Sequence, residues 1–539
     1  MERVRRNRES IHFQQALPAD PLNSSIVNER GLQKIIPPYV LIFGSVSSAL
    51  YLGIWQLSLQ FNWGKGYADR PILSYLAAYI LLFALYAFFC NRIRQKGTDR
   101  KLFWTIVVLG LLFRAAIFPA QQIQEDDVYR YLWDGKVFSK GINPFKFAPS
   151  EISYATEFRI RHPIGFRTEY DEESRGQLDF LDKLRWENQT ALLYFDRINH
   201  PDVPTIYPPL AQFTFRSVAH LRPDNIYALR LAYLGFDLLA LFFIVKTLRA
   251  LGKNPNLCAI YFLCPLVIKE TFNSTHLDII GIAFLCAAVY FFVKKQALWS
   301  GVFLGLSFLG KLYPIILAPI FFKRFLVDQE TGEYAHWGRA CAVAIAFLAT
   351  AILGYLPFLD IGWKTFAGLN TFTATWQNND SLFAMILWFW RDLVALSTDT
   401  VLFNKYPLPE FFAKANVALV LLGVLGYLFF KKRVETSEEG VKHLFIMMGL
   451  VFLLSPVQNP WYLCWTVPFL CFFPWRSWML LTGLMGMYYL DFYFDYQDIG
   501  QYSAWIPLFE YTPFYLYFAY EWRARKRVGI QAPAAGSQK

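Results

Sequence analysis

The sequence predicts an all-α fold, a polytopic bundle of roughly 11–14 transmembrane helices with one long loop outside the membrane. Hydrophobic residues make up 55% of the 539 residues and charged residues 17%, with a mean hydropathy of +0.28. A chain this apolar and this poor in charge is unlike an ordinary soluble protein. The formal net charge of +11 comes from short Lys and Arg clusters between apolar runs, a pattern that indicates membrane topology and argues against a nucleic-acid partner.

The apolar runs divide the chain into three parts. Residues 1–38 are basic and polar for too long to form a secretory signal peptide, and they predict a cytoplasmic tail. Residues 39–522 form the transmembrane domain, and residues 523–539 form a second basic cytoplasmic tail. Clear spans are expected at 39–59, 73–90, 103–120, 226–248, 277–293, 337–356 and 413–430. Less regular apolar segments lie at 257–268, 298–322, 444–473 and 478–518.

The basic clusters predict which side each loop faces. Those at 91–101, 294–295, 323–324 and 431–433 all fall on one side of the membrane if the N-terminus is cytoplasmic. The third span then ends outside, so the long loop at about 121–225 is extracytoplasmic, with interfacial helices and paired prolines at TIYPPL. Loops of this length are usually functional.

Several kinds of chemistry have no sequence support. All seven cysteines lie in apolar segments without a CxxC pair, which predicts neither a disulfide nor a sulfur-based metal site. The chain also lacks a phosphate-binding glycine loop, a Rossmann fingerprint and an internal repeat. Cytoplasmic nucleotide chemistry is therefore not expected.

Three consecutive carboxylates, Glu125, Asp126 and Asp127, open the long loop in QEDDVYRYLWDG. A helix here would place Asp127, Arg130, Tyr131 and Asp134 on one face, as in an amphipathic helix lying on a membrane surface. One carboxylate could take a proton from a hydroxyl while its neighbour raises its pKa. The alternative is a solvated loop whose acids meet Arg130 or lipid headgroups.

Charged residues also interrupt two later apolar segments. In VIKETFNSTHLD these are Lys269, Glu270, His276 and Asp278, and ionisable residues at the membrane edge are costly enough to suggest function. The alternative is an outer turn whose charges reach water. His276 and Asp278 also suggest a metal, without further nameable ligands. Lys311, in FLGKLYPIILAP, could meet an anionic phosphate or simply extend to the interface.

Two polar and aromatic stretches complete the candidates. TATWQNNDSLF contains Trp376 and Asn379, which suit a sugar face and its hydroxyls, although interfacial tryptophan is an equally good explanation. SPVQNPWY contains Gln458, Trp461 and Tyr462, with a proline-made turn as the alternative.

The ordered motifs resemble those of the GT-C superfamily of integral-membrane glycosyltransferases, most closely the bacterial polyprenol-phosphomannose-dependent mannosyltransferases of families 87 and 39. The motifs are DDVYRYLWDG, GINPF, PTIYPPLAQ, KETFNSTHLD, FLGKLYPIILAP and SPVQNPWYLCW. The resemblance implies that Asp126 is the catalytic base and Asp127 its partner. In the family the acidic motif often follows the first span, whereas here it follows the third, which leaves the sidedness unchanged.

The resemblance implies transfer of a hexose, with mannose favoured, from a polyprenyl-phosphate sugar to a lipid, glycan or protein acceptor by an inverting single displacement. The expected location is the outer side of a bacterial inner membrane, among membrane lipids.

Candidate donor-phosphate ligands are Lys269, Lys311 and Arg130. Candidate sugar or acceptor ligands are Glu125, Tyr131, Asp134, His276, Asp278, Trp376, Asn379, Gln458, Trp461 and Tyr462. We expect no required cofactor, with a divalent metal as the alternative. The alternatives are a transporter or flippase of lipid-linked sugars and a lipid-oligosaccharide polymerase or ligase.

Overall fold

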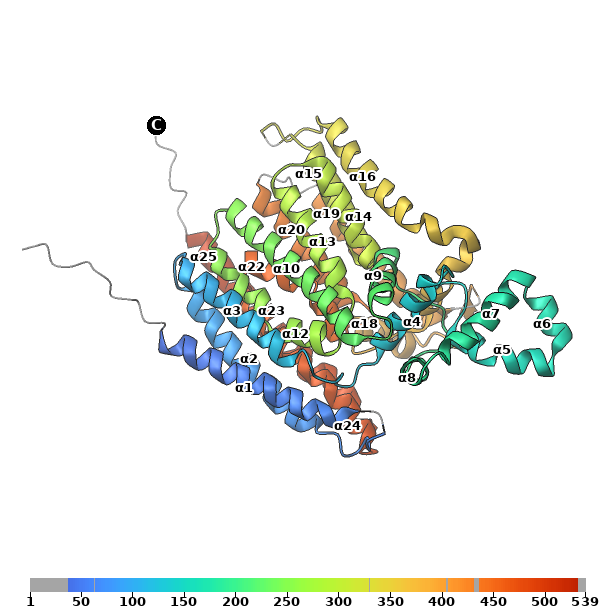
Figure 1. Ribbon diagram of the computed structural model, residues 1–539. Coiled ribbons are helices and arrows are strands. Elements are labelled where there is room, and N and C mark those ends of the chain that lie inside the picture. The colour runs from blue at the N-terminus through green and yellow to red at the C-terminus, as the bar shows by residue number, and fades with distance from the viewer. Residues whose placement is uncertain (1–36, 63, 329, 404–405, 431–435, 532–539) are drawn as a thin grey trace, which may run out of the picture.

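A computed structural model describes residues 37–531 except 63, 329, 404–405 and 431–435, and the regular secondary structure of the described chain is almost entirely helical (Figure 1). The one sheet in this part pairs two short antiparallel strands, β1 (Val401–Leu402) and β2 (Tyr406–Pro407). The prediction of an all-α polytopic fold is confirmed. Most of the predicted N-terminal tail, residues 1–36, and the end of the C-terminal tail, residues 532–539, lie outside the described residues.

The N-terminal half begins with three helices and a short 3-10 turn and continues through the long loop into the central helices. The first elements are α1 (Pro38–Ser58), η1 (Leu59–Phe61), α2 (Ile72–Arg94) and α3 (Arg100–Ile117). The loop contains α4 (Asp127–Ser139), α5 (Pro149–Arg161), α6 (Pro163–Glu169), α7 (Glu172–Arg185), α8 (Gln189–Phe195) and α9 (Pro209–Leu221). The next elements are α10 (Ile226–Ala250), η2 (Pro255–Cys258), α11 (Ala259–Phe262), α12 (Pro265–Ile268) and η3 (Lys269–Asn273).

The C-terminal half is also helical. It continues with α13 (Asp278–Val293), α14 (Ala297–Gly310), η4 (Tyr313–Leu317), α15 (Ala318–Leu326), α16 (Trp337–Tyr355), η5 (Leu356–Phe366), α17 (Ala367–Thr375), α18 (Leu382–Trp388), η6 (Phe389–Leu393) and α19 (Leu408–Phe430). It ends with α20 (Ser437–Leu454), α21 (Pro460–Leu463), α22 (Val467–Phe472), α23 (Arg476–Leu484), η7 (Met485–Tyr489), α24 (Leu490–Tyr496), η8 (Gly500–Trp505) and α25 (Ile506–Gln531).

Within the described residues, five helical segments are long and apolar enough to cross a membrane. They are Pro38–Phe61, Ile72–Arg94, Ile226–Ala250, Trp337–Thr375 and Leu408–Phe430. Two shorter apolar helices, α13 and α14, lie between them. Several other predicted spans are broken into short pieces because proline removes a helix hydrogen bond, as at Pro265, Pro314 and Pro460. Non-helical backbone inside a membrane-spanning segment is tolerated where other parts of the protein or a water-filled cavity surround it.

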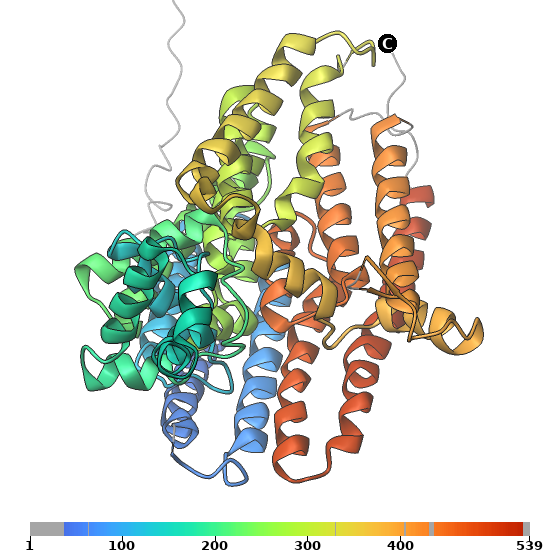
Figure 2. The same ribbon diagram turned by 90° about the vertical axis from the view of Figure 1, so that its right-hand side faces the viewer.

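The long loop folds into helices that gather at one flank of the bundle (Figure 2). Helices α5 to α7 project furthest from the other helices, whereas α4 and α9 lie against the bundle (Figure 1). Helix α4 follows Asp126 directly. The start of α4 therefore brings the three carboxylates to the edge of the bundle.

The prediction that α4 lies on a membrane surface as an amphipathic helix is wrong. Every residue of α4 from Val128 to Phe138 is buried in the protein. Helix α9 packs against α4 so closely that a Cβ atom at Gly135 would lie 2.5 Å from the carbonyl oxygen of Phe215. The polar face of α4 is satisfied internally, since Arg130 and Asp134 form an ion pair at 2.9 Å.

Replacement of Gly135 by alanine should destabilise the protein, because the added methyl group would push α9 away from α4. Overpacking of this kind costs about 1–3 kcal/mol, so we expect a lower thermal unfolding midpoint in detergent. Gly176→Ala is the matched control, because the position is helical and nothing lies within 4 Å of an added Cβ. A Gly135→Ala protein as stable as the Gly176→Ala protein would contradict the close α4–α9 contact.

Candidate functional site

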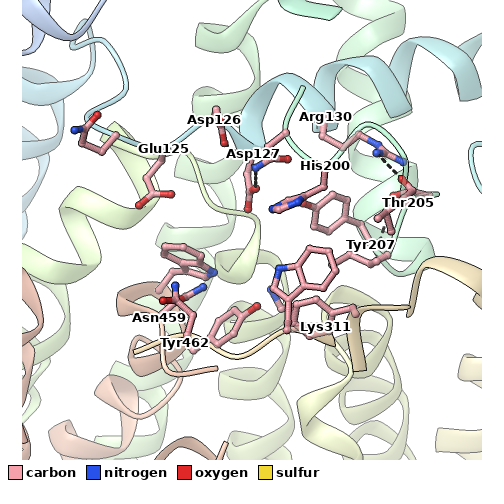
Figure 3. A pocket seen from close by; sticks show the side chains of 18 of the residues that line it. Glu125, Asp126, Asp127, Arg130, His200, Thr205, Tyr207, Lys311, Asn459 and Tyr462 are labelled. Carbon is pink, nitrogen blue, oxygen red and sulfur yellow. Dashed lines mark hydrogen bonds between the residues drawn. The ribbon is translucent and has the colours of Figure 1, made fainter. Parts of the chain in front are cut away.

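A cavity of about 330 Å³ opens at the start of α4, between the long loop and the bundle (Figure 3). Polar and aromatic side chains from six separate segments line it. They are Gln124, Glu125, Asp126, Asp127, Arg130, Asn199, His200, Val203, Pro204, Thr205, Ile206, Tyr207, Lys311, Phe372, Trp376, Asn378, Asn459, Trp461, Tyr462, Tyr488 and Phe492. Eight of these were candidates from the sequence: Glu125, Asp126, Asp127, Arg130, Lys311, Trp376, Trp461 and Tyr462.

The two aspartates are held together by one amide. The Asn199 Nδ2 group donates to Asp126 Oδ1 at 2.7 Å and to Asp127 Oδ1 at 2.8 Å. The Tyr131 hydroxyl donates to the other oxygen of Asp127 at 3.3 Å. Tyr131 is fully buried and does not line the cavity, so it orients Asp127 from behind.

The carboxylates differ in how their surroundings affect proton binding. Burial, together with the negative charge of Asp127, raises the pKa of Asp126 to about 7. Burial also raises the pKa of Glu125 well above its ordinary value, an effect that the positive charge of Lys269 opposes and the charge of Glu270 reinforces. Asp126 is therefore half-protonated near neutral pH, and Glu125 holds its proton to a higher pH than an ordinary glutamate does.

Lys311 supplies a cation on the side of the cavity opposite Asp126 and Asp127 (Figure 3). Helix α14 ends at Gly310, Lys311 is extended, and the next helical turn, η4, begins at Tyr313. Its ammonium lies 3.3 Å from Asp278 and 4.6 Å from the centre of the Tyr462 ring. Asp278 lies outside the cavity lining, and its second oxygen accepts from Trp465 Nε1 at 2.7 Å.

Arg130 lines the cavity, but its charge already has a partner. Its Nε group donates to Asp134 at 2.9 Å and an Nη1 group donates to the carbonyl of Val203 at 3.0 Å. Asp134 is buried outside the lining and also accepts from the Gln212 amide at 3.1 Å. Arg130 and Asp134 therefore link α4 to the segment between α8 and α9 and to α9 itself.

Lys269 is not brought to the cavity. It is buried behind the carboxylates, 3.4 Å from Glu270, where its ammonium donates to Ser274 at 2.7 Å and contacts the Tyr489 hydroxyl. The one turn of π-helix at η3 places Lys269 and Glu270 side by side in this position.

His276 lies between the carboxylates and Trp461, one of the aromatic residues that line the cavity. Its ring stacks on Trp461 with centroids 3.8 Å apart. Its nitrogens lie 3.7 Å from Asp127 and 3.9 Å from Glu125, and within the described residues neither nitrogen has a hydrogen-bond partner. His276 is buried and does not line the cavity, so it stands directly behind the acids.

The two polar stretches near the C-terminal half are joined in space. The backbone N–H of Asn378 donates to Pro456, and that of Gln458 donates to Asn378. Asn379 donates to Glu510 at 2.8 Å, and the amide of Gln458 donates to the carbonyls of Leu453 and Ser455. Asn379 and Gln458 lie outside the lining and stabilise the strand-like contact that brings Trp376 beside the cavity.

Sequence reasoning missed several lining residues. Thr205, Tyr207, Asn378 and Asn459 lie inside stretches that the sequence marks as polar breaks or motifs. No spacing pattern marks the others, which include Asn199, His200, Tyr488 and Phe492, since they come from a loop and from a distant helix end.

A second cavity of about 210 Å³ adjoins the first and shares Gln124, Glu125, Asp126 and Phe492 with it. Polar residues of the α1–α2 connection and of the loop line its other walls, among them Asn62, Arg70 and Arg197. Arg70 donates to Gln124 at 2.5 Å. Asp126 therefore lines both cavities and is accessible from each of them.

No metal cluster is evident in the described part of the chain, because it contains no group of three or more His, Cys, Asp or Glu side chains placed to hold a metal ion. The seven cysteines are free thiols, and all but Cys341 are buried.

Comparisons with known proteins identify the relatives of this chain. Residues 205–456 match glycosyltransferase family 87, and residues 412–518 match the MptB C-terminal domain. GPI mannosyltransferase 1 of Candida albicans is 24% identical over 241 residues, 43% of this chain and 57% of that protein. The protein of the same name from Kluyveromyces lactis is 32% identical over 115 residues, 21% of this chain and 28% of that protein. No solved structure matches the chain significantly. The chain therefore spans little more than half the length of the first relative, and these matches confirm the resemblance carried by the motifs.

Proposed function

We propose, from the premise that this chain is a GT-C-type, mannosyltransferase-like membrane protein, that it transfers a mannosyl unit from a polyprenyl-phosphate sugar to a lipid, glycan or protein acceptor. The observation that carries the proposal is the pair Asp126 and Asp127 on one side of a cavity with Lys311 on the other. A base and a cation so placed match a displacement in which a proton is removed and a phosphate leaves.

The reaction is a single displacement with inversion. Asp126 takes the proton of the acceptor hydroxyl, and the acceptor oxygen forms a bond to the anomeric carbon. The bond from that carbon to the phosphate oxygen breaks on the opposite face, and polyprenyl phosphate leaves with the electron pair. The group that leaves is a phosphate monoester, polyprenyl phosphate, which is a competent leaving group, so positioning and charge stabilisation are the main needs of the site.

Lys311 is the phosphate partner that the geometry favours. It lines the cavity, and the one carboxylate contact it makes in the described part of the chain, with Asp278 at 3.3 Å, is longer than a good charge-assisted hydrogen bond. Arg130 lines the cavity too, but Asp134 already satisfies it. Lys269 is reassigned as the counter-charge of Glu270, since it does not reach the cavity.

The second cavity gives the acceptor a separate approach. It meets the first at Glu125 and Asp126, so a hydroxyl entering from it would reach the base from the side away from Lys311. The aromatic wall of the first cavity, which includes Trp376, Trp461 and Tyr462, would hold the faces of the donor sugar.

The direct test uses the purified full-length protein with a radiolabelled polyprenyl-phosphate mannose and membranes as the source of acceptor. We expect label to move to a new product from the lipid-linked donor and not from a nucleotide sugar. Transfer from the nucleotide sugar without lipid carrier would refute the donor assignment. Movement of the labelled lipid across a vesicle membrane without a new covalent product would favour the flippase alternative.

The pH dependence of the reaction should report the ionisation of Asp126. Only the carboxylate form can accept a proton, so kcat/KM should rise with pH and reach half its limit near the pKa of about 7. Asp127→Asn removes the neighbouring negative charge that raises this pKa, so the rise should move to lower pH. Profiles of both proteins measure the shift, and an unchanged midpoint in Asp127→Asn would contradict the coupling.

We also propose that the carboxylates face the extracytoplasmic side. Single cysteines at the exposed positions Glu169, on α6, and Thr98, between α2 and α3, should differ in labelling by an impermeant thiol reagent in intact cells. The Glu169 position should react, whereas the Thr98 position, beside the basic cluster at 91–101, should react only after lysis. The reverse result would invert the orientation. A further control position suggested by the charge pattern, Lys432, lies outside the described residues.

A further inference from the structure

A third cavity, of about 300 Å³, lies between α2, α23 and α25, away from the carboxylates. One part of its lining is apolar and the other carries two arginines. The lining residues are Phe83, Ala87, Asn91, Arg94, Arg476, Met479, Leu480 and Tyr517.

This cavity sits at the opposite end of the bundle from the candidate site. Helix α2 ends at Arg94, and α3 then runs from Arg100 to Ile117 before the chain reaches Asp126. Eighteen helical residues rise about 27 Å, close to the thickness of a membrane core. The C-terminal end of α25 also lies at the end of the molecule away from α5 to α7 (Figure 1).

The two arginines lack acidic partners. Within the described residues, neither Arg94 nor Arg476 has a carboxylate within 4.0 Å. The only side-chain bond of Arg476 in this part of the chain is to the Asn91 oxygen at 3.3 Å, and the Arg94 guanidinium makes none there. Two guanidinium groups without a carboxylate in direct contact therefore face one cavity.

The nearest acid is already occupied. Glu521 accepts the backbone N–H groups of Arg476 and Ser477 at 3.1 and 2.9 Å and forms an ion pair with Arg525 at 2.9 Å. The carboxylate of Glu521 is thus already bound by the first backbone N–H groups of α23 and by Arg525. An anion in the cavity would still meet two guanidinium groups that have no carboxylate in direct contact.

The rest of the lining suits a hydrocarbon chain. Phe83 and Ala87 on α2 face Met479 and Leu480 on α23, and these four side chains form an apolar wall next to the arginines. Tyr517 and Asn91 add polar groups near the charged end. This combination of an apolar groove and a basic end is complementary to a lipid with an anionic headgroup.

We propose that this cavity binds a membrane phospholipid with a net negative headgroup, its phosphate between Arg94 and Arg476 and an acyl chain against Phe83, Ala87, Met479 and Leu480. Basic pockets between transmembrane helices commonly bind such headgroups. The site is separate from the transfer reaction, so it would stabilise the packing of α2, α23 and α25 without taking part in chemistry.

The test is lipid binding to the purified full-length protein in detergent, measured by native mass spectrometry. Phosphatidylglycerol should bind about tenfold or more tightly than phosphatidylcholine, and the double variant Arg94→Gln/Arg476→Gln should lose that preference. Arg92→Gln is the matched control, because Arg92 is exposed on the same last turn of α2 and does not line the cavity. It should bind phosphatidylglycerol like the wild type.

Two further measurements distinguish binding of a lipid from binding of a free anion, and the second uses a variant that keeps both arginines. Glycerol 3-phosphate should not compete with phosphatidylglycerol, since it lacks the acyl chain. Ala87→Phe, which fills the groove and keeps both charges, should weaken phosphatidylglycerol binding. Equal binding of phosphatidylglycerol by the wild type and the double variant, or by the wild type and Ala87→Phe, would overturn the proposal. Competition by glycerol 3-phosphate would overturn it as well.

Discussion

Asp126→Asn should lower kcat by about 10²- to 10⁴-fold while the protein folds and inserts normally, because general-base catalysis contributes about that much. The asparagine side chain keeps the shape of the aspartate and its oxygen can still accept from Asn199 at the position now 2.7 Å away. What it cannot do is take the acceptor proton. Turnover of the purified variant with polyprenyl-phosphate mannose, beside its thermal unfolding curve, measures both parts of the expectation.

The matched control is Asp202→Asn, an exposed carboxylate in the same loop that does not line the cavity. It should leave kcat unchanged. If Asp126→Asn keeps more than about half of the wild-type turnover, Asp126 is not the base. If only Asp127→Asn is inactive, the roles of the two acids are reversed.

The second large effect concerns Lys311. Its removal should raise the KM for the polyprenyl-phosphate donor far more than that for the acceptor, because loss of one partner of a desolvated charge pair costs about 2–5 kcal/mol. Lys311→Met alone would also leave Asp278 buried and unpaired, which destabilises proteins by about 3–5 kcal/mol. The double variant Lys311→Met/Asp278→Asn avoids this problem, since the Asn oxygen can still accept from Trp465.

The control for Lys311 is the buried pair that does not reach the cavity. Lys269→Met/Glu270→Gln removes an equivalent lysine–carboxylate contact, and it should leave the donor KM near the wild-type value. Steady-state kinetics of both double variants decide the assignment. A raised donor KM in the Lys269 variant with a normal value in the Lys311 variant would restore Lys269 as the phosphate partner and exclude Lys311.

The sequence by itself determined the membrane-helical class of this protein and the chain breaks that carry its polar groups. Asp126 precedes a helix, Lys311 lies between Gly310 and Pro314, and Gln458 lies between two prolines. Each of these features depends on local rules: proline cannot donate a helix hydrogen bond, and an apolar segment of fixed length fills a bilayer. Rules of this kind depend only on residues that are near one another in the sequence, so the sequence is enough to apply them.

The tertiary structure alone decided which polar groups are free to act. Helical spacing brings Arg130 and Asp134 together on one face of α4, but only the tertiary packing buries the pair and adds Val203 and Gln212 as further partners. Lys269 and Lys311 look alike in the sequence, yet only the fold commits Lys269 to Glu270 and opens Lys311 to the cavity. Asn199 joins the two aspartates from 72 and 73 residues away. Burial and pairing between such distant segments are set when the chain closes on itself, and no local pattern encodes them.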